Sequence, residues 1–268
     1  MHDSSRLVDA RRETIVARLS QGEAVVAARL AVEFGVSEDV VRRDLREIAA
    51  RGLCKRVYGG ALPVSPAGAS IADRTESDPE RKLALARAAA TLLRPKQSIF
   101  LDSGSTNARL AALLPGNLQL TVVTNSIQVA AAATGRAGVA LFLIGGGVNS
   151  HAGACIGTRA AAELQRHRID LGFIGACAIS AADGLCGFEP EEVDFKRALL
   201  GISKSAVVMV TNEKLETTAP HLIAPLAAID RLIIEHDAPS EILERLTGSG
   251  ALLMAALPPD TRVPTSLC

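Results

Sequence analysis

The fold of this chain is decided by residues 36–62, VSEDVVRRDLREIAARGLCKRVYGGAL. Ser37 is a typical first capping residue of a helix, and the acids Glu38 and Asp39 that follow it suit the positive end of a helix dipole. Gly52 is a typical residue for the end of a helix. The sequence therefore predicts a helix that begins at Ser37 and stops at Gly52.

The predicted helix has one apolar face, because its apolar residues recur at the three- and four-residue spacing of a buried stripe. These residues are Val40, Val41, Leu45, Ile48 and Ala49. After Gly52, residues 53–57 and 61–64 are expected to form two short strands, and Gly59 and Gly60 allow the tight reversal between them. A helix followed by a small hairpin is typical of a winged helix-turn-helix, a module that reads DNA.

Basic residues are concentrated in this segment, although the formal net charge of the chain is zero. Between residues 42 and 56 the basic residues outnumber the acids; they are Arg42, Arg43, Arg46, Arg51, Lys55 and Arg56, against Asp44 and Glu47. Arginine can neutralise backbone phosphate and can grip the edge of guanine with two donors. An ordinary solvated helix face is the alternative, but the capped helix and basic hairpin together favour DNA binding.

The same segment resembles the signature of the DeoR family of bacterial transcription regulators. Arg42, Arg43 and Asp44 match the family pattern, whereas Val40 stands where the family usually has threonine and Tyr58 where it usually has histidine. We assign the DNA contacts to seven residues of the segment: Ser37, Arg42, Arg43, Arg46, Lys55, Arg56 and Tyr58.

The resemblance also implies two supporting helices upstream, over residues 11–19 and 25–34, with a shared core. The core residues that it implies are Ile15, Leu30 and Phe34.

The chain of 268 residues is long enough for two domains. We expect a winged helix-turn-helix domain over residues 1–62, a connector rich in Pro, Ala, Ser and Gly over residues 63–73, and a larger domain over residues 74–268.

The sequence has neither an apolar run long enough to cross a bilayer nor the apolar stretch of a signal peptide, so we expect a cytoplasmic protein. Five cysteines without a CxxC pair indicate neither a disulfide framework nor a metal site.

Short β-branched runs alternate with helical patterns beyond Pro95, which predicts an α/β domain with a mostly parallel sheet. The expected helices cover residues 80–93, 107–114, 127–133 and 158–166, and further strands are expected at residues 206–211 and 231–234. Ligands of such sheets gather at the carboxyl ends of the strands. The loops that leave the strands therefore become the candidate binding site.

The loop Asp102–Thr106, DSGST, has the residues of a phosphate cradle. Ser103, Ser105 and Thr106 offer hydroxyls at the beginning of a helix, and Gly104 lets a ligand approach closely. A capping serine or threonine after a strand is also common without any ligand. The chain has neither a GxGxxG nor a GxxxxGK[ST] motif, so we expect no nucleotide cofactor and a small phosphorylated ligand instead.

Residues 74–235 are similar to the sugar-phosphate sensor domain of DeoR-type repressors. The motifs LDSGST, VVTNS, LIGGG, DLGFIGA and EEVDFKRA occur in the expected order. The resemblance implies a phosphorylated sugar or polyol as the effector, held by the DSGST loop. It also implies contacts from Asp102, with its carboxylate on sugar hydroxyls, and from Asn125, Gly146, Glu192, Lys196 and Lys214. By their spacing alone, Glu192 and Lys196 are more typical of an ordinary surface pair on a helix than of a ligand site.

The leading hypothesis is that the protein is a repressor that leaves its operator when a phosphorylated sugar binds. Under this hypothesis we expect no catalytic residues in the chain. Helix-turn-helix proteins read paired half-sites, so a homodimer or homotetramer is expected. The alternative is a sugar-phosphate isomerase, because the implied sensor fold resembles ribose-5-phosphate isomerase; Asp102, Asp170 or Glu192 would then be the base. The region 170–187 lacks the acid-rich, glycine-rich loop with a lysine that such isomerases carry, so we expect no enzyme.

Overall fold

The computed structural model describes residues 2–20, 25–50, 54–57, 59–63 and 70–259. The chain divides into two compact units, Met1–Gly68 and Ala69–Cys268. Within the described residues, no helix has both the length and the apolar character needed to cross a membrane.

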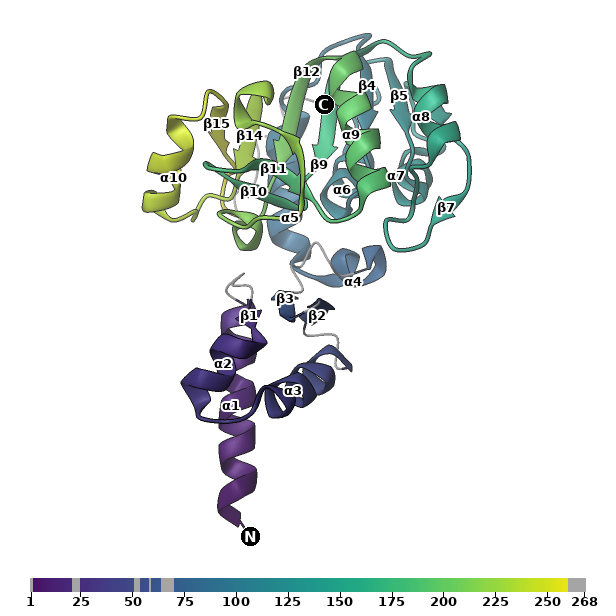
Figure 1. Cartoon of the computed structure of the whole chain (residues 1–268). Coiled ribbons are helices and arrows are strands. Elements are labelled where there is room, and N and C mark those ends of the chain that lie inside the picture. Colours follow the sequence, from purple (N-terminus) through teal and green to yellow (C-terminus); the bar gives the residue numbers. More distant parts are fainter. Residues whose placement is uncertain (1, 21–24, 51–53, 58, 64–69, 260–268) are drawn as a thin grey trace. The chain divides into compact units, whose positions relative to one another are not determined.

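The first unit is a winged helix-turn-helix, as the sequence predicts (Figure 1). Its described elements are α1 (His2–Ser20), β1 (Val25–Val26), α2 (Ala27–Phe34), α3 (Glu38–Ala50), β2 (Cys54–Val57) and β3 (Gly60–Pro63). Gly35 ends α2 in the left-handed conformation, with φ of 62°, and α3 begins directly after Ser37. Ile15, Leu30 and Leu45 are buried in the common core, and Phe34 packs against it while remaining partly exposed.

The prediction that a helix begins at Val25 is wrong. Val25 and Val26 form strand β1, which pairs with Ala61 and Gly60 of β3, so the sheet has the order β1-β3-β2. Two adjacent β-branched residues suit a strand better than a helix. The close approach requires glycine at position 60, because a Cβ there would lie 2.0 Å from the carbonyl oxygen of Val25. Helix α1 also begins earlier than residue 11, at His2.

A buried carboxylate joins α1 to α3 in the first unit. Asp44 is 1% exposed and accepts hydrogen bonds from the Nε atoms of Arg11 and Arg12, each at 2.7 Å. Arg12 also pairs with the exposed Glu47 at 2.6 Å. Asp44 therefore packs between the helices rather than pointing toward DNA, and it removes two arginines from the free basic surface.

We expect Asp44→Asn to weaken the first unit by about 1.5–3 kcal/mol, because the charged hydrogen bonds of both arginines are lost. Hydrogen–deuterium exchange should become faster in α1 and α3. Glu47→Gln is the matched control, since it removes only an exposed partner of Arg12, and such surface pairs contribute less than about 1 kcal/mol. Equal protection in wild type and Asp44→Asn would contradict this role.

The second unit is built on a parallel sheet of seven strands in the order β15-β14-β12-β9-β4-β5-β6. The strands are β4 (Ser98–Leu101), β5 (Leu120–Thr124), β6 (Val139–Leu143), β9 (Ile169–Gly175), β12 (Ser203–Met209), β14 (Arg231–Ile234) and β15 (Leu252–Ala255). The helices are α4 (Ile71–Glu76), α5 (Pro79–Ala90), α6 (Ser105–Ala112), α7 (Ile127–Ala133), α8 (Thr158–Leu164), α9 (Pro190–Ile202) and α10 (Ser240–Thr247). The predicted α/β class with a mostly parallel sheet is confirmed.

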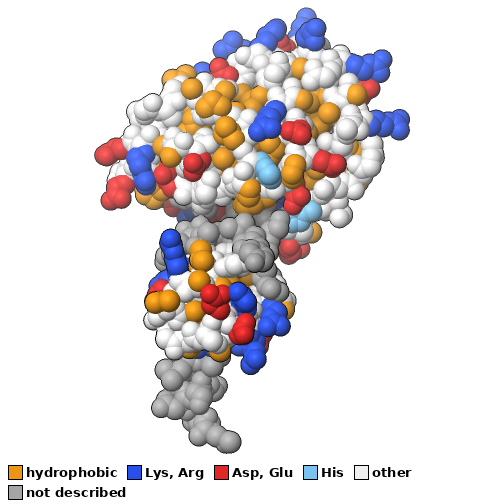
Figure 2. Space-filling model, in the orientation of Figure 1, with side chains coloured by type: hydrophobic (Ala, Val, Ile, Leu, Met, Phe, Trp, Pro, Cys, Tyr) orange, Lys and Arg blue, Asp and Glu red, His pale blue; other side chains and the backbone are white. Residues whose placement is uncertain are grey.

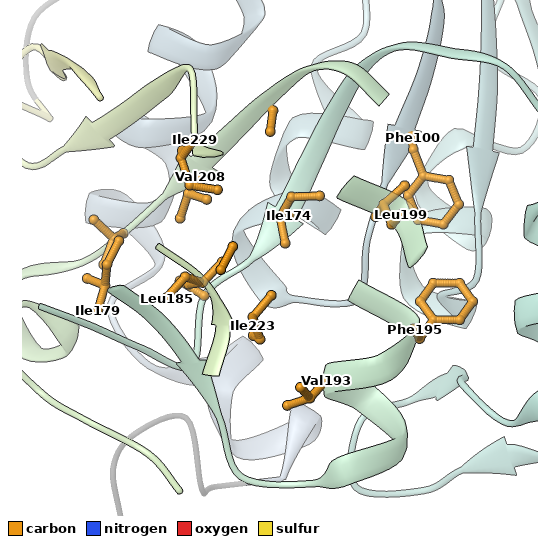
Figure 3. Close-up of a cluster of buried hydrophobic side chains, with 14 of the residues drawn as sticks. Phe100, Ile174, Ile179, Leu185, Val193, Phe195, Leu199, Val208, Ile223 and Ile229 are labelled. Atoms are coloured by element: carbon orange, nitrogen blue, oxygen red, sulfur yellow. The ribbon is translucent and has the colours of Figure 1, made fainter. Parts of the chain in front are cut away.

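The central strands are buried on both faces, because successive side chains of a strand point to opposite sides. Phe100 belongs to the buried cluster drawn in Figure 3, and its ring lies near that of Phe195 on α9, with 6.1 Å between centroids. Its neighbours Ile99 and Leu101 face the other cluster, with residues of α5, α6 and α7. This two-sided burial explains the continuous apolar runs in the sequence.

The chain reverses its direction across the sheet between β4 and β9. From β4 it proceeds through β5 to the edge strand β6, and then returns to β9 on the other side of β4. The carboxyl ends of β4 and β9 are therefore adjacent at the point of reversal, where loops diverge to opposite faces. Figure 1 shows α6 and α9 beside these strands.

Several elements were not predicted. The strands β10 (Ala178–Ser180), β11 (Gly184–Gly187) and β13 (His221–Ala224) form a small antiparallel sheet, and β7 (Val148–Asn149) pairs with β8 (Ala154–Cys155). The short 3-10 helices η2 (Asn212–Lys214) and η3 (Leu226–Ala228) follow β12 and β13. Helix α4 begins at Ile71, inside the range expected for the connector, because Ser70 caps it and Ile71 is buried.

Candidate functional site

A small cavity lies at the adjacent carboxyl ends of β4 and β9. Its volume is about 20 Å³, which is room for roughly one water molecule. The residues around it come from α4, the loop after β4, and the ends of β9, α9, β12 and η2. They are Arg74, Ser103, Gly104, Ser105, Thr106, Asn107, Ile174, Gly175, Ala176, Lys196, Met209 and Lys214. The loop proposed as a phosphate cradle thus lines this cavity.

The cradle loop is fixed by hydrogen bonds between the two strand ends. The side-chain amide of Asn107 donates to the carbonyl oxygens of Asp102 and Phe173, at 3.0 and 3.1 Å. The Gly175 N–H donates to Asp102 Oδ2 at 2.9 Å. Gly104 precedes α6 with φ of 152°, a conformation that favours glycine. The first-turn N–H groups of α6 have no partner within the helix, so they remain available to an anion.

A buried ammonium, that of Lys196, stands behind the loop. Lys196 is 1% exposed; its Nζ donates to Gly175 O at 2.6 Å and contacts Glu192 Oε1 at 2.7 Å and Asp102 Oδ2 at 3.5 Å. Burial acts against its charged form, but the two carboxylates hold the pKa of Lys196 above its ordinary value. Burial also acts to raise the pKa of Glu192, yet the Lys196 charge and hydrogen bond outweigh it and keep that pKa low. Lys196 and Glu192 therefore form an ion pair.

The pocket has more positive charge than this ion pair uses. Lys214 Nζ donates to the carbonyl oxygen of Ala176 at 3.0 Å. Lys214 as a whole is half-buried, but many protein atoms surround its side chain. The resulting loss of hydration lowers the pKa of Lys214 to about 8. Arg74 lines the same cavity, and its Nε is buried without a hydrogen-bond partner among the described residues. Burial raises the pKa of Asp102, although Lys196 acts in the opposite direction.

A second, larger cavity of about 370 Å³ lies elsewhere in this unit. It is lined by Gly146, Gly147, Val148, Asn149, Ile156, Gly157, Thr158, Arg159, Ala160 and Glu191. Asn125 is fully buried after β5, where its side-chain amide donates to the carbonyl oxygen of Cys155 at 3.2 Å. Throughout the described part of the chain, no three or more His, Cys, Asp or Glu side chains are grouped to hold a metal ion.

The exposed face of α3 in the first unit is basic but not uniformly so. Arg42 pairs with Glu38 at 2.7 Å and lies 3.6 Å from Asp39, so the first-turn acids partly neutralise it. Arg43 and Arg46 are exposed, and Arg46 Nε donates to the carbonyl oxygen of Arg42 at 3.4 Å. Figure 2 shows basic side chains gathered on this unit with acidic ones among them.

Comparisons with known proteins agree with these two parts of the chain. The family model of the DeoR C terminal sensor domain matches residues 77–236, and the model of the DeoR-like helix-turn-helix domain matches residues 11–67. The chain belongs to the DeoR family.

Two curated relatives of this DeoR-family chain illustrate the similarity. One is named as an aga operon transcriptional repressor of Escherichia coli O157:H7; it is 30% identical over 90% of this chain and 91% of its own length. The other is the glycerol-3-phosphate regulon repressor of Escherichia coli (strain K12), 29% identical over 88% of this chain and 94% of its own. Among solved structures, ribose 5-phosphate isomerase A from Methanocaldococcus jannaschii is similar over 52% of this chain and 55% of its own, with 20% identity and a TM-score of 0.39. That likeness says nothing about activity.

The structure brings together most of the residues assigned to the effector. Around the small cavity lie Ser103, Gly104, Ser105, Thr106, Lys196 and Lys214. Asp102 and Glu192 contact Lys196 from behind the lining. Gly146 is placed differently, at the larger cavity, and Asn125 lines neither cavity. The resemblance implied one site for all ten residues; six of them line the small cavity and Gly146 lines the larger one.

The DNA-contact residues are placed less completely. Ser37, Arg42, Arg43 and Arg46 lie on the exposed side of α3 or directly before it. Lys55 and Arg56 belong to strand β2, where the backbone pairs with β3. Their side chains and Tyr58 lie outside the described residues.

The sequence did not indicate two residues that line the small cavity, Arg74 and Asn107. Arg74 lies between the expected connector and the helix expected at residues 80–93, and nothing near it in the sequence signals a ligand. Asn107 follows the cradle directly, and an amide in the first turn of that helix was the one available signal. Its two hydrogen bonds cross from β4 to β9, a pairing that the sequence does not show.

We expect Gly175→Ala to destabilise the second unit by about 1–3 kcal/mol, because an added methyl group over-packs the site. Its Cβ would lie 2.4 Å from the carbonyl oxygen of Ser103 and 3.1 Å from Asp102 Oδ2. Gly201→Ala is the matched control: its Cβ meets nothing within 4 Å, and alanine in a helix should add roughly 0.5–1 kcal/mol. Urea unfolding followed by circular dichroism measures both, and equal stability of the two variants would contradict the packing argument.

Proposed function

We propose that this DeoR-family protein is a repressor that binds operator DNA through α3 and its wing, and that a small phosphorylated sugar or polyol weakens this binding. The effector would occupy the cavity at the ends of β4 and β9. One curated relative is named a glycerol-3-phosphate regulon repressor, which supports a phosphorylated polyol as one class of effector. No cofactor is part of the proposal.

The observation that carries the proposal is the unmatched positive charge beside the cradle loop. Lys196 is compensated by Glu192 and Asp102, whereas Lys214 donates to a carbonyl oxygen and Arg74 leaves Nε without a partner. A phosphate dianion would satisfy both cations and the free N–H groups of the α6 terminus. The serine and threonine hydroxyls of the loop add further donors.

The DNA end of the proposal involves two copies of the chain. A recognition helix in the major groove reads one half-site, and dimers read two half-sites about one helical turn apart. We therefore propose a homodimer or homotetramer that acts in the cytoplasm. Ser37, Arg42, Arg43 and Arg46 would contact DNA from α3, with Lys55, Arg56 and Tyr58 contributing from the wing.

An isomerase activity is less well supported. Asp170, one candidate base, lies at the beginning of β9 and so at the opposite edge of the sheet from the cavity; Lys204 binds it at 2.7 Å and lowers its pKa. Glu192 is held as an ion pair with Lys196, and its lowered pKa makes it a weak base. The family of the chain is one of regulators.

A thermal-shift screen of phosphorylated sugars and polyols tests the proposal, with the unphosphorylated compounds as controls. We expect at least one phosphorylated compound to raise the melting temperature through binding to the folded state. The same compound should release the protein from DNA upstream of its own gene in a mobility-shift experiment. If no phosphorylated compound has either effect, the proposed function is wrong.

For the DNA face, we expect Arg42→Ala and Arg43→Ala each to weaken operator binding by about 1–3 kcal/mol, or roughly 5- to 150-fold. Arg43 should have the larger effect, because Glu38 and Asp39 already partly neutralise Arg42. Fluorescence anisotropy with the upstream DNA measures the affinity. Arg166→Ala, which removes an exposed arginine just after α8, is the control. Footprints of both α3 variants identical to wild type would refute the assignment.

Effector affinity should fall at alkaline pH because of Lys214. Its pKa of about 8 leaves the ammonium charged at pH 7 and mostly neutral at pH 9, whereas a phosphate monoester remains a dianion across this range. We expect affinity to fall about tenfold between these values. In Lys214→Arg the charge persists, so the profile should be flat. Calorimetric titration at constant ionic strength measures it, and a wild-type profile as flat as that of the variant would exclude this role.

A further inference from the structure

Helix α4 is a short element between the connector and the body of the sensor unit. It begins at Ile71, just after the division of the chain at residues 68 and 69. Ser70 caps it by accepting a hydrogen bond from the N–H of Asp73 at 3.3 Å. A helix of six residues is not stable alone in water, so its position depends on contacts with the rest of the unit.

The beginning of α4 is attached to the loop that carries residues 151–153. The Ile71 N–H donates to the carbonyl oxygen of His151 at 3.0 Å. The Ile71 side chain is 7% exposed and packs closely over Gly153, where an added Cβ would lie 2.8 Å from its Cγ2 atom. Thr75 also contacts Gln128 of α7 at 3.1 Å. These contacts place α4 beside the carboxyl edge of the sheet, near α6 (Figure 1).

The end of α4 is held by a single buried ammonium. Lys82 of α5 is 3% exposed, and its Nζ donates to the carbonyl oxygens of Arg74 and Ser77 at 2.5 and 2.6 Å and to Ser77 Oγ at 2.7 Å. Carbonyl oxygens at a helix end carry the negative end of the dipole and accept such a cation well. Burial lowers the pKa of Lys82, as expected for an ammonium bound only by neutral acceptors.

Arg74 brings this helix into the effector cavity. The other lining residues belong to the sheet, its flanking helices and the loop at its edge, whereas Arg74 belongs to α4. Its Nε is buried and has no hydrogen-bond partner, and its guanidinium makes no ion pair with any residue in the described ranges. Its charge contributes to the low pKa of Glu192, so it lies close to the ion pair behind the cradle loop.

We propose that Arg74 binds the phosphate of the effector and that α4 transmits occupancy of the cavity to the connector. This inference rests on the proposed function and identifies α4 as the element through which the effector would influence DNA binding. A ligand shifts a conformational equilibrium only through contacts that differ between the two states. Arg74 can make such a contact, because a phosphate in the cavity would lie beside it. Arg74 is also the lining residue on α4, the helix that begins at Ile71 near the end of the connector.

The first test compares Arg74→Gln with Arg166→Gln, which removes an exposed arginine elsewhere in the same unit. The probes are inorganic phosphate and the phosphorylated compound with the largest thermal shift in the wild type. We expect Arg74→Gln to bind the compound roughly 10- to 150-fold more weakly, the loss of a charge-assisted hydrogen bond, and Arg166→Gln to bind like wild type. Arg74→Lys should retain part of the affinity, because it keeps the charge.

The second test separates transmission from binding with Ile71→Ala, which loosens the attachment of α4 without replacing any residue that lines the cavity. We expect the affinity for the compound to fall much less than in Arg74→Gln, because the guanidinium is still present, and the factor by which the compound weakens DNA binding to become smaller. Glu76→Gln, at an exposed position of the same helix, should keep the full factor. Thermal melting establishes that each variant is folded.

The outcomes distinguish the two levels of the argument. If no phosphorylated compound binds the wild type, the proposed function fails and this inference with it. If the wild type responds and Arg74→Gln binds the compound equally well, Arg74 is not a ligand and the proposed function stands. If Ile71→Ala keeps the full coupling factor while α4 exchanges its amides faster, α4 is not the route of transmission.

Discussion

The buried ammonium of Lys196 is the interaction on which the ligand end of the sensor unit depends. An unpaired charge inside a protein costs several kcal/mol, so Lys196 must be compensated from several directions. Its partners are Gly175 at the end of β9, Glu192 on its own helix and Asp102 at the end of β4. The contacts of the Lys196 ammonium therefore hold the end of β9, helix α9 and the end of β4 together. They also fix the position of the cradle loop in the absence of a ligand.

This arrangement divides the cations of the site between two roles. Lys196 is matched by carboxylates, so it maintains the geometry of the loop and adds little attraction for an anion. Lys214 and Arg74 have no carboxylate partner among the described residues, so in the proposed site they would supply the charge that a phosphate requires. Because burial already lowers the pKa of Lys214 to about 8, an anion beside it relieves a cost that the free protein carries.

The sequence predicted the elements that local patterns determine. The helix after Ser37 follows from its cap and apolar stripe, and the parallel sheet follows from runs such as residues 98–101 that are buried on both faces. Elements determined by distant contacts were missed. Val25 and Val26 form a strand because β3 lies beside them, and α4 exists because Lys82 and the loop at His151 hold it.

The same distinction applies to the candidate site. Residues of the cradle loop are adjacent in sequence, so their hydroxyls and glycine could be recognised as a group. Arg74 reaches the cavity from a segment that precedes the cradle by about thirty residues, and no periodicity marks it. Gly146 was assigned through family resemblance and lines another cavity. Spatial neighbours from separate strand ends require the topology of the sheet, because the sequence fixes only the order in which they occur.

The weak intrinsic stability of α4 is what makes it suitable as a coupling element. Sheet strands buried on both faces cannot shift without loss of many apolar contacts, whereas α4 is attached by a few hydrogen bonds and Ile71. One charge-assisted bond from Arg74 to a phosphate contributes about 1.5–3 kcal/mol, which is similar to typical coupling free energies of about 1–3 kcal/mol. A change of that size can displace α4 while leaving the sheet intact. By linkage, operator DNA that favours one position of α4 must weaken effector binding by the same factor.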